Sequence, residues 1–170
     1  EGNRIHAMGD VRAVPLPAAA HVVPARGKYL IPGLWDMHVH VYRAADGVYP
    51  LFIANGVTGI REAGSPVPLD TLRLLRREIL AGTRVGPPRQ ILSGPAVDNY
   101  AGPCDRAQMR RRDQYDVCVG DAADARHVVD SLKAAGADML KLRDIASSTY
   151  FVMAAEARRL HMPFGGHALG

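Results

Sequence analysis

The most informative part of the sequence is GKYLIPGLWDMHVHV, residues 27–41. Residues 27–31 have the composition of a short strand, and Pro32-Gly33 marks a turn. After this turn, residues 34–41 alternate between polar and apolar side chains, which predicts a strand because successive side chains of a strand point to opposite faces. The polar face holds Asp36, His38 and His40, and the apolar face holds Met37, Val39 and Val41. We expect helices to cover the apolar face, so that the strand is buried on both sides.

The two histidines of the polar face are candidate metal ligands. Residues two apart lie roughly 6.5–7 Å apart along a strand, and imidazoles so placed can converge on one divalent ion through Zn–N bonds of about 2.0–2.1 Å. Buried polar groups need a partner, and a metal ion satisfies both His38 and His40. On this motif alone, two strand histidines bonded to polar groups of the core remain the alternative.

Short apolar segments alternate with helical segments after residue 34. Further strands are expected at 57–61, 89–93, 138–142 and 163–167, and helices at about 49–55, 70–82, 121–136 and 148–160, with Asp70 or one of its neighbours, and Asp121, as caps. Residues 94–119 form a loop longer than most structureless connections, which makes it a candidate functional loop. The alternation implies parallel βαβ units, and no glycine-rich phosphate turn follows the first strand. The pattern therefore predicts an α/β fold, a partial (β/α)8 TIM barrel with about five βα units.

The region before residue 32 has a different pattern of expected secondary structure, with strands and turns but no helices. Strands are expected at Arg4–Met8, Val11–Val14 and His21–Val23, followed by the strand at 27–31. Proline-rich segments separate them. The change to alternating strands and helices at Leu34 indicates a boundary in the organisation of the chain.

Two later strands carry further candidate ligands. Lys141 shares a strand face with Met139, and if Leu140 and Leu142 pack under the helices, Lys141 points into the barrel. Burial lowers the pKa of a lysine because it disfavours the charged form, and a neutral amine can react with carbon dioxide to give a carbamate able to bridge two metals. A salt bridge of Lys141 to Asp36 or Glu62 is the alternative. His167 ends the last strand.

The sequence around these residues resembles the amidohydrolase superfamily over nearly the whole chain. GKYLIPGLWDMHVH resembles the first barrel strand of that superfamily, AGADMLKL resembles the fourth strand, in which the lysine is carboxylated, and FGGHALG resembles the fifth strand with its metal histidine. NGVTGIR and LAGTRVGPPRQILSG extend the similarity. The resemblance is closest to the imidazolonepropionase-like and prolidase-like members, and the strand lysine favours the binuclear subgroup.

The resemblance implies a domain organisation and a site. Residues 1–32 are expected to be the remnant of an N-terminal β-sandwich, and residues 33–170 the first part of a truncated metal-dependent hydrolase barrel. Two zinc ions are expected, held by the metal ligands His38, His40, carboxylated Lys141 (a carbon dioxide adduct that bridges the ions) and His167. Asn99 and Tyr100 are candidates for binding the substrate. The histidine of strand six and the general-base aspartate of strand eight have no counterpart before Gly170, so no catalytic residue is assigned.

The expected function is hydrolysis of C–N bonds in amides, cyclic amides or dipeptides by metal-activated water. A catalytically silent barrel fragment or scaffold is the alternative, and a mononuclear cyclic amidase or a phosphoester or carbamate hydrolase is the alternative among enzymes. A (β/α)8 barrel takes about 250 residues. We therefore expect the 170-residue chain to be a fragment of a larger enzyme, inactive and aggregation-prone alone. A homo-oligomer of the full-length enzyme is left open.

Composition and charge exclude several classes. The chain is 48% hydrophobic and 22% charged, which is ordinary for a globular protein, and no apolar run approaches the ~18 residues of a membrane span. The net charge of +4 comes from arginines within 73–77 and 110–112 that we expect to form a solvated surface rather than a nucleic-acid site. Cys104 and Cys118 are expected to be reduced thiols. The cytoplasm is favoured weakly, with the periplasm and secretion left open.

Overall fold

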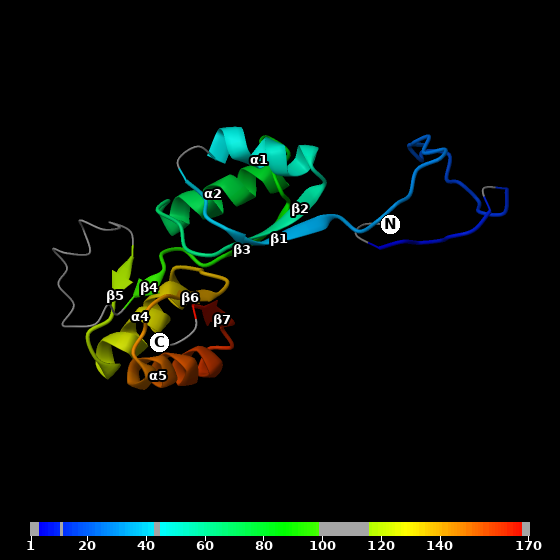
Figure 1. Cartoon of the computed structure of the whole chain (residues 1–170). Coiled ribbons are helices and arrows are strands. Elements are labelled where there is room, and N and C mark those ends of the chain that lie inside the picture. Colours follow the sequence, from blue (N-terminus) through cyan, green and yellow to red (C-terminus); the bar gives the residue numbers. More distant parts are fainter. Residues whose placement is uncertain (1–3, 11, 43–44, 99–115, 168–170) are drawn as a thin grey trace. The chain divides into compact units, whose positions relative to one another are not determined.

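A computed structural model describes residues 4–10, 12–42, 45–98 and 116–167. The chain divides into two compact units, Glu1–Pro32 and Gly33–Gly170, and every helix and strand of the described residues belongs to the second unit (Figure 1).

The strands predicted before residue 32 are not formed in the described part of the first unit. Its backbone makes local turns instead, such as the bond from Lys28 N to Ala25 O at 3.0 Å. A strand is stable only when a neighbouring strand takes up its N–H and C=O groups, and no described segment of this unit pairs with another. The described residues of this unit therefore form no β-sandwich.

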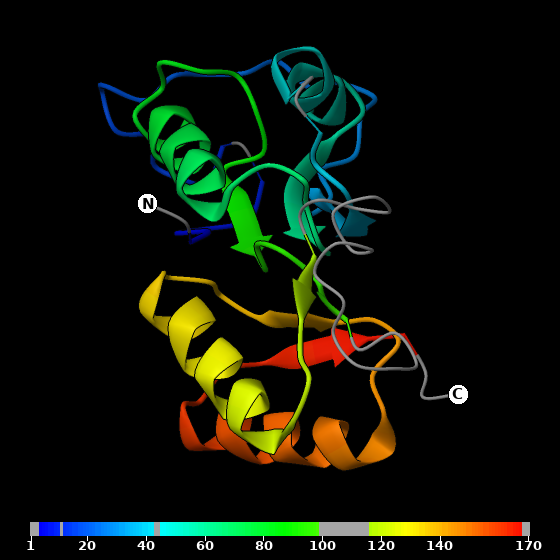
Figure 2. The same ribbon diagram turned by 90° about the vertical axis from the view of Figure 1, so that its left-hand side faces the viewer.

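The second unit begins with a three-stranded parallel sheet. Its strands are β1 (Leu34–Val39), β2 (Val57–Glu62) and β3 (Arg89–Leu92), side by side in chain order. Helices α1 (Ala45–Ala54) and α2 (Leu69–Leu80) lie on one side of this sheet (Figures 1 and 2). Along α2 the apolar side chains of Leu72, Leu75 and Ile79, spaced three and four residues apart, are buried.

Two details of these helices differ from prediction. Helix α1 begins at Ala45 rather than near Tyr49. Asp70 is not the N-cap of α2, because Pro68 takes that position and Asp70 lies in the first turn. A carboxylate in the first turn is still favourable, since it interacts with the positive end of the helix dipole.

The chain continues into a four-stranded parallel sheet. The strands are β4 (Val97–Asp98), β5 (Val117–Cys118), β6 (Leu140–Leu142) and β7 (Phe164–Gly166), in the order β5-β4-β6-β7. Helices α4 (Ala122–Ala134) and α5 (Ser147–Arg159) pack together on one side of β6 and β7 (Figure 2). The predicted cap at Asp121 is confirmed, since its carboxylate accepts from Ala123 N at 2.7 Å and Asp124 N at 2.9 Å.

The predicted long loop contains strands. Residues 94–119 include β4 and β5, which pair in parallel, so this connection is not structureless over its described parts. Cys118, at the end of β5, is disulfide-bonded, so the expectation of a reduced thiol there is wrong. Cys104 lies outside the described residues.

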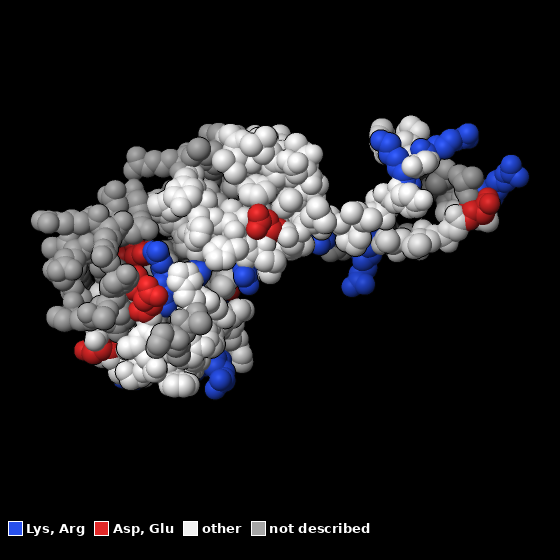
Figure 3. All heavy atoms as spheres, viewed as in Figure 1, with Lys and Arg blue, Asp and Glu red and all other residues white. Residues whose placement is uncertain are grey.

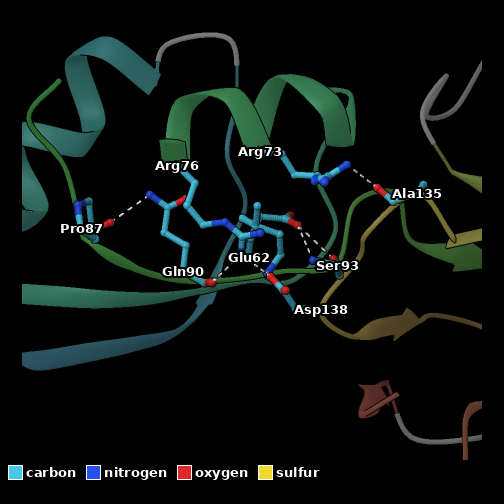
Figure 4. A network of polar contacts seen from close by, with 9 residues as sticks. Glu62, Arg73, Arg76, Pro87, Gln90, Ser93, Ala135 and Asp138 are labelled. Atoms are coloured by element: carbon cyan, nitrogen blue, oxygen red, sulfur yellow. Dashed lines mark hydrogen bonds and ion pairs between the residues drawn. The ribbon is translucent and has the colours of Figure 1, made fainter. Parts of the chain in front are cut away.

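Polar contacts join the two sheets (Figure 4). Asp138 N donates to Leu92 O at 2.7 Å, and the Asp138 carboxylate accepts from Leu92 N at 2.9 Å and from Arg76 at 2.6 Å. Arg76 also donates to Gln90 O at 3.1 Å. The end of β3 therefore lies beside Asp138, just before the start of β6. The edge strands are β1 and β3 in the first described sheet and β5 and β7 in the second, and barrel closure is not shown.

The arginines of α2 were expected to form a solvated surface, and Arg77 is exposed, but Arg73 and Arg76 are half-buried and bind other groups. Arg76 binds Asp138, and Arg73 donates to Ala135 O at 2.8 Å. On the face shown in Figure 3, acidic and basic side chains of residues 33–170 are interspersed. Arginines 110–112 lie outside the described residues. None of the described helices has the length and apolarity of a membrane span.

Strand β1 is buried less than predicted. Val39 and Val41 are buried, but Leu34, Trp35 and Met37 are 50%, 39% and 46% exposed. The reason is that β1 is an edge of the described sheet, with β2 as its sole described neighbour. Within β1 only Val39 is buried, and His38 and His40, which were expected to face the interior, are exposed.

Candidate functional site

The site is built around the two histidines at the end of β1. His38 Nε2 lies 3.2 Å from His40 Nε2, while Val39 and Val41 point into the core. Two ligands of a tetrahedral zinc ion lie about 3.3 Å apart when each bond is about 2.0–2.1 Å. The spacing of the two nitrogens therefore suits a shared metal ion.

The protonation of His40 is set by a carbonyl group. His40 Nδ1 lies 2.7 Å from Gly64 O, and because a carbonyl oxygen only accepts, Nδ1 must carry the hydrogen. In the neutral ring this leaves Nε2 with its lone pair directed towards His38. Metal-binding histidines usually hold the other ring nitrogen in this way.

A pocket of about 200 Å³ brings the predicted residues together. His40 from the end of β1, Lys141 from β6 and His167 after β7 all line it. The remaining lining residues are Tyr42, Ala63, Gly64, Ser65, Pro66, Ala96, Asp116 and Arg143. His38 is joined to this group through His40. The C-terminal ends of the parallel strands thus converge on one pocket, which is where α/β barrels place their active sites.

Lys141 is buried in this pocket, and no acidic side chain of the described residues forms an ion pair with it. Its side chain is 4% exposed, and Leu140 and Leu142 on either side of it are in the core. No ion pair or hydrogen bond joins Lys141 to Asp36 or Glu62 among the described residues. Desolvation, and then the positive charges of Arg143 and Arg61, lower the pKa of Lys141.

The electrostatics of the pocket favour neutral nitrogen ligands. The pKa of His38 is lowered, first by desolvation and then by the charges of Lys141 and His40. Arg143, whose charge acts on Lys141, forms an ion pair with Asp116 at the pocket. Deprotonated imidazole and amine groups are the forms that bind metals or react with carbon dioxide.

The strand β7 reaches the pocket because it has no side chain at residue 166. A Cβ on Gly166 would lie 1.9 Å from Leu142 O, whereas a Cβ on Gly165 would meet nothing within 4 Å. This close approach allows His167 N to donate to Leu142 O at 3.1 Å. The second glycine of the pair before His167 thus has a packing reason.

Replacement of Gly166 by alanine is expected to destabilise the protein by about 2 kcal/mol, because the new methyl group forces β7 away from β6. Gly165→Ala is the matched control and should change the free energy of unfolding by less than about 0.5 kcal/mol. Urea denaturation of both variants measures the difference. Equal stabilities would show that β7 does not approach β6 as closely as described.

Glu62, at the end of β2, is a component of the site that the sequence did not single out except as a possible partner of Lys141. It is fully buried. Its Oε2 accepts from Ser93 Oγ at 3.0 Å and Ser93 N at 3.3 Å (Figure 4), and its Oε1 has no hydrogen-bond partner among the described residues. Desolvation raises the pKa of Glu62 to about 7. The sequence signal that could have identified Glu62 is an acidic residue directly after a predicted buried strand.

The described residues supply only part of a zinc donor set. They contain no group of three or more His, Cys, Asp or Glu side chains arranged to hold a metal ion. The two imidazoles have the spacing of two ligands of one ion. Asn99 and Tyr100, the predicted substrate contacts, lie outside the described residues.

No protein-family model and no curated protein matches the chain, but solved structures do. A prolidase crystallised with N-methylphosphonate-L-proline matches with a TM-score of 0.73 and 20% identity, over 92% of this chain and 47% of that one. A Xaa-Pro dipeptidase with bound methionine matches with a TM-score of 0.64 and 21% identity, over 81% and 43%. A bottromycin amidohydrolase matches with a TM-score of 0.65 and 24% identity, over 81% and 28%.

These matches concern the fold. The chain spans about half the length of the prolidase that it matches, and all three identities are below 25%. The described strands and helices have the arrangement found in the corresponding part of those hydrolases. The chain therefore has an amidohydrolase-like α/β fold.

Proposed function

We propose that this chain forms the metal-binding part of a hydrolase that cleaves C–N bonds in amides, cyclic amides or dipeptides. The observation that carries the proposal is the convergence of His40, Lys141 and His167 on one pocket, with His38 Nε2 3.2 Å from His40 Nε2. The names of the structural neighbours, prolidase and Xaa-Pro dipeptidase, favour a small amide or dipeptide substrate.

Each ligand has a proposed role. His38 and His40 hold one zinc ion through their Nε2 atoms, and His167 holds a second. The bound ions would supply an activated water molecule and polarise the scissile carbonyl group. Asn99 and Tyr100 are proposed to contact the substrate.

Lys141 is proposed to bridge the two ions as a carbamate. Its neutral Nζ donates its lone pair to the carbon of carbon dioxide, an N–C bond forms, and one proton leaves the nitrogen to solvent. The product is an anion with two oxygen atoms. Burial of Lys141, its lowered pKa and the absence of an ion pair to it within the described residues all favour the neutral amine that this reaction needs.

The proposal is tested in the protein that carries this chain, purified with zinc and bicarbonate. Hydrolysis of Xaa-Pro dipeptides, N-acyl amino acids and lactams is measured before and after removal of metal with a chelator. We expect turnover that the chelator abolishes and zinc restores. Turnover that is unchanged by metal removal, or by Lys141→Ala, would contradict the proposal. Lys141→Arg is the matched variant, since it keeps the positive charge but cannot form a carbamate.

A further inference from the structure

We propose that Glu62 and Ser93 are positioning residues that fix the orientation of Gly64 and thereby the tautomer of His40. The part of this inference that concerns metal affinity rests on the proposed function. The part that concerns the tautomer is a property of the metal-free chain.

Gly64 has a backbone conformation that other residues rarely adopt. Its φ angle is +100°, and a Cβ there would lie 3.1 Å from Ala96 Cβ and 3.5 Å from Lys141 Cγ. The left-handed region is open to glycine at little cost. The direction of the Gly64 carbonyl is therefore not held by a side chain of its own, and neighbouring groups must hold it.

Those neighbours belong to the end of β3. Gly64 N donates to Ser93 Oγ at 2.9 Å, which fixes the peptide group before Gly64. Ser65 N donates to Gly94 O at 3.2 Å, which fixes the peptide group after it. The second peptide group contains Gly64 O, the acceptor for His40 Nδ1. Both sides of Gly64 are thus bound to residues 93–94.

The buried carboxylate of Glu62 orients the Ser93 hydroxyl. Ser93 Oγ has one hydrogen to donate, and Glu62 Oε2 at 3.0 Å and Gly94 O at 3.1 Å are its acceptors. When the hydrogen points to Glu62, a lone pair of Oγ remains for Gly64 N–H. Ser93 N also donates to the same carboxylate at 3.3 Å. Figure 4 shows Glu62 and Ser93 facing each other from β2 and the end of β3.

Hydrogen bonds on both sides of Gly64 connect Glu62 and residues 93–94 to the histidine pair. Glu62 accepts from Ser93, and Ser93 accepts from Gly64 N. The next peptide group is held through Ser65 N and Gly94 O, and its carbonyl oxygen, Gly64 O, faces His40 Nδ1. If the Gly64 carbonyl turned away, His40 would lose the acceptor that keeps the hydrogen on Nδ1. Its other tautomer carries the hydrogen on Nε2 and has no lone pair there for a metal ion.

The test begins with the metal-free wild-type chain. Long-range ¹H–¹⁵N spectra of the histidine rings report which nitrogen carries the hydrogen, and we expect Nδ1–H at His40. The same spectra are recorded for Ser93→Ala, with Ser93→Thr as the variant that keeps the hydroxyl group. Val129→Ala, which truncates a buried residue of α4, controls for loss of stability alone. Zinc affinity is measured by competition with a chelator.

In Ser93→Ala we expect a mixture of His40 tautomers and a zinc Kd raised by at least about tenfold. Ser93→Thr should resemble the wild type. Val129→Ala should lower the melting temperature without changing the His40 tautomer or the zinc Kd. If Ser93→Ala does not fold, Ser93→Cys replaces it, because the thiol accepts hydrogen bonds only weakly.

Two results would overturn the inference. One is hydrogen on Nε2 of His40 in the wild-type chain, and the other is an unchanged tautomer and zinc Kd in folded Ser93→Ala or Ser93→Cys. If the wild type has Nδ1–H at His40 and the Ser93 variant has a tautomer mixture, but neither binds zinc, the inference is supported and the proposed function is contradicted.

Discussion

Replacement of both His38 and His40 by alanine is expected to abolish tight binding of divalent metal. The two Nε2 atoms, 3.2 Å apart, are the donors that the first ion needs, and no other described histidine lies beside them except His167 across the pocket. A structural zinc site is worth about 10–16 kcal/mol over four ligands. Loss of two ligands should therefore weaken zinc binding by at least about a thousandfold.

Elemental analysis after dialysis against limiting zinc measures this effect. His127→Ala is the control, because His127 lies on the exposed side of α4, where its Nε2 is 3.5 Å from Ser131 Oγ. The control should retain the zinc content of the wild type. Equal zinc content in all three proteins would rule out a metal site at His38 and His40.

Replacement of Glu62 by glutamine is expected to stabilise the protein above pH 7 and not at pH 4.5. Burial raises the pKa of Glu62 from 4.5 to about 7, so between these values the folded state keeps a proton that the unfolded state has lost. The free energy of unfolding of the wild type therefore falls as pH rises through this window and levels off above pH 7. The difference between a pKa of 4.5 and a pKa of about 7 corresponds to about 3 kcal/mol in the free energy of unfolding.

Glutamine has no charge to bury, and its side-chain oxygen can still accept from Ser93. The stability difference between Glu62→Gln and the wild type should therefore grow by about 3 kcal/mol between pH 4.5 and pH 8 in urea denaturation. Glu156→Gln is the contrasting control. Hydrogen bonds and the charge of Arg159 lower the pKa of Glu156, so that variant should lose stability at neutral pH relative to acid. A pH-independent effect at Glu62 would mean that its carboxyl group is not desolvated.

Local alternation of side chains predicted much of the site. The two-residue period placed His38 and His40 together opposite Val39 and Val41, and the same period separated Lys141 from its two neighbouring leucines. The alternation of strands with helices predicted a parallel α/β fold. It could be read from the sequence because the spacing of apolar residues and helix capping are properties of short segments. The Asp121 cap is one such local feature.

Long-range contacts were beyond the sequence. Arg76 was expected in solvent, yet it binds Asp138 from 62 residues away. Strand β1 was expected to be buried on both faces, which depends on a second neighbour that the described sheet does not contain. The strands expected before residue 32 are not formed in the described residues, again because no neighbouring strand is present there. Strand propensity alone does not form a strand without a hydrogen-bonding partner for the backbone.

Side-chain alternation within a strand predicts which residues share a face, and it paired His38 with His40 and separated Lys141 from its neighbouring leucines. How these side chains are held depends on contacts between segments that are far apart in the sequence. Gly64, Ser93 and Glu62 come from two strand ends about 30 residues apart, and Gly166 is required because Leu142 O approaches it. Such hydrogen bonds and close approaches depend on the register between strands, which is set by packing of the whole sheet rather than by any one segment.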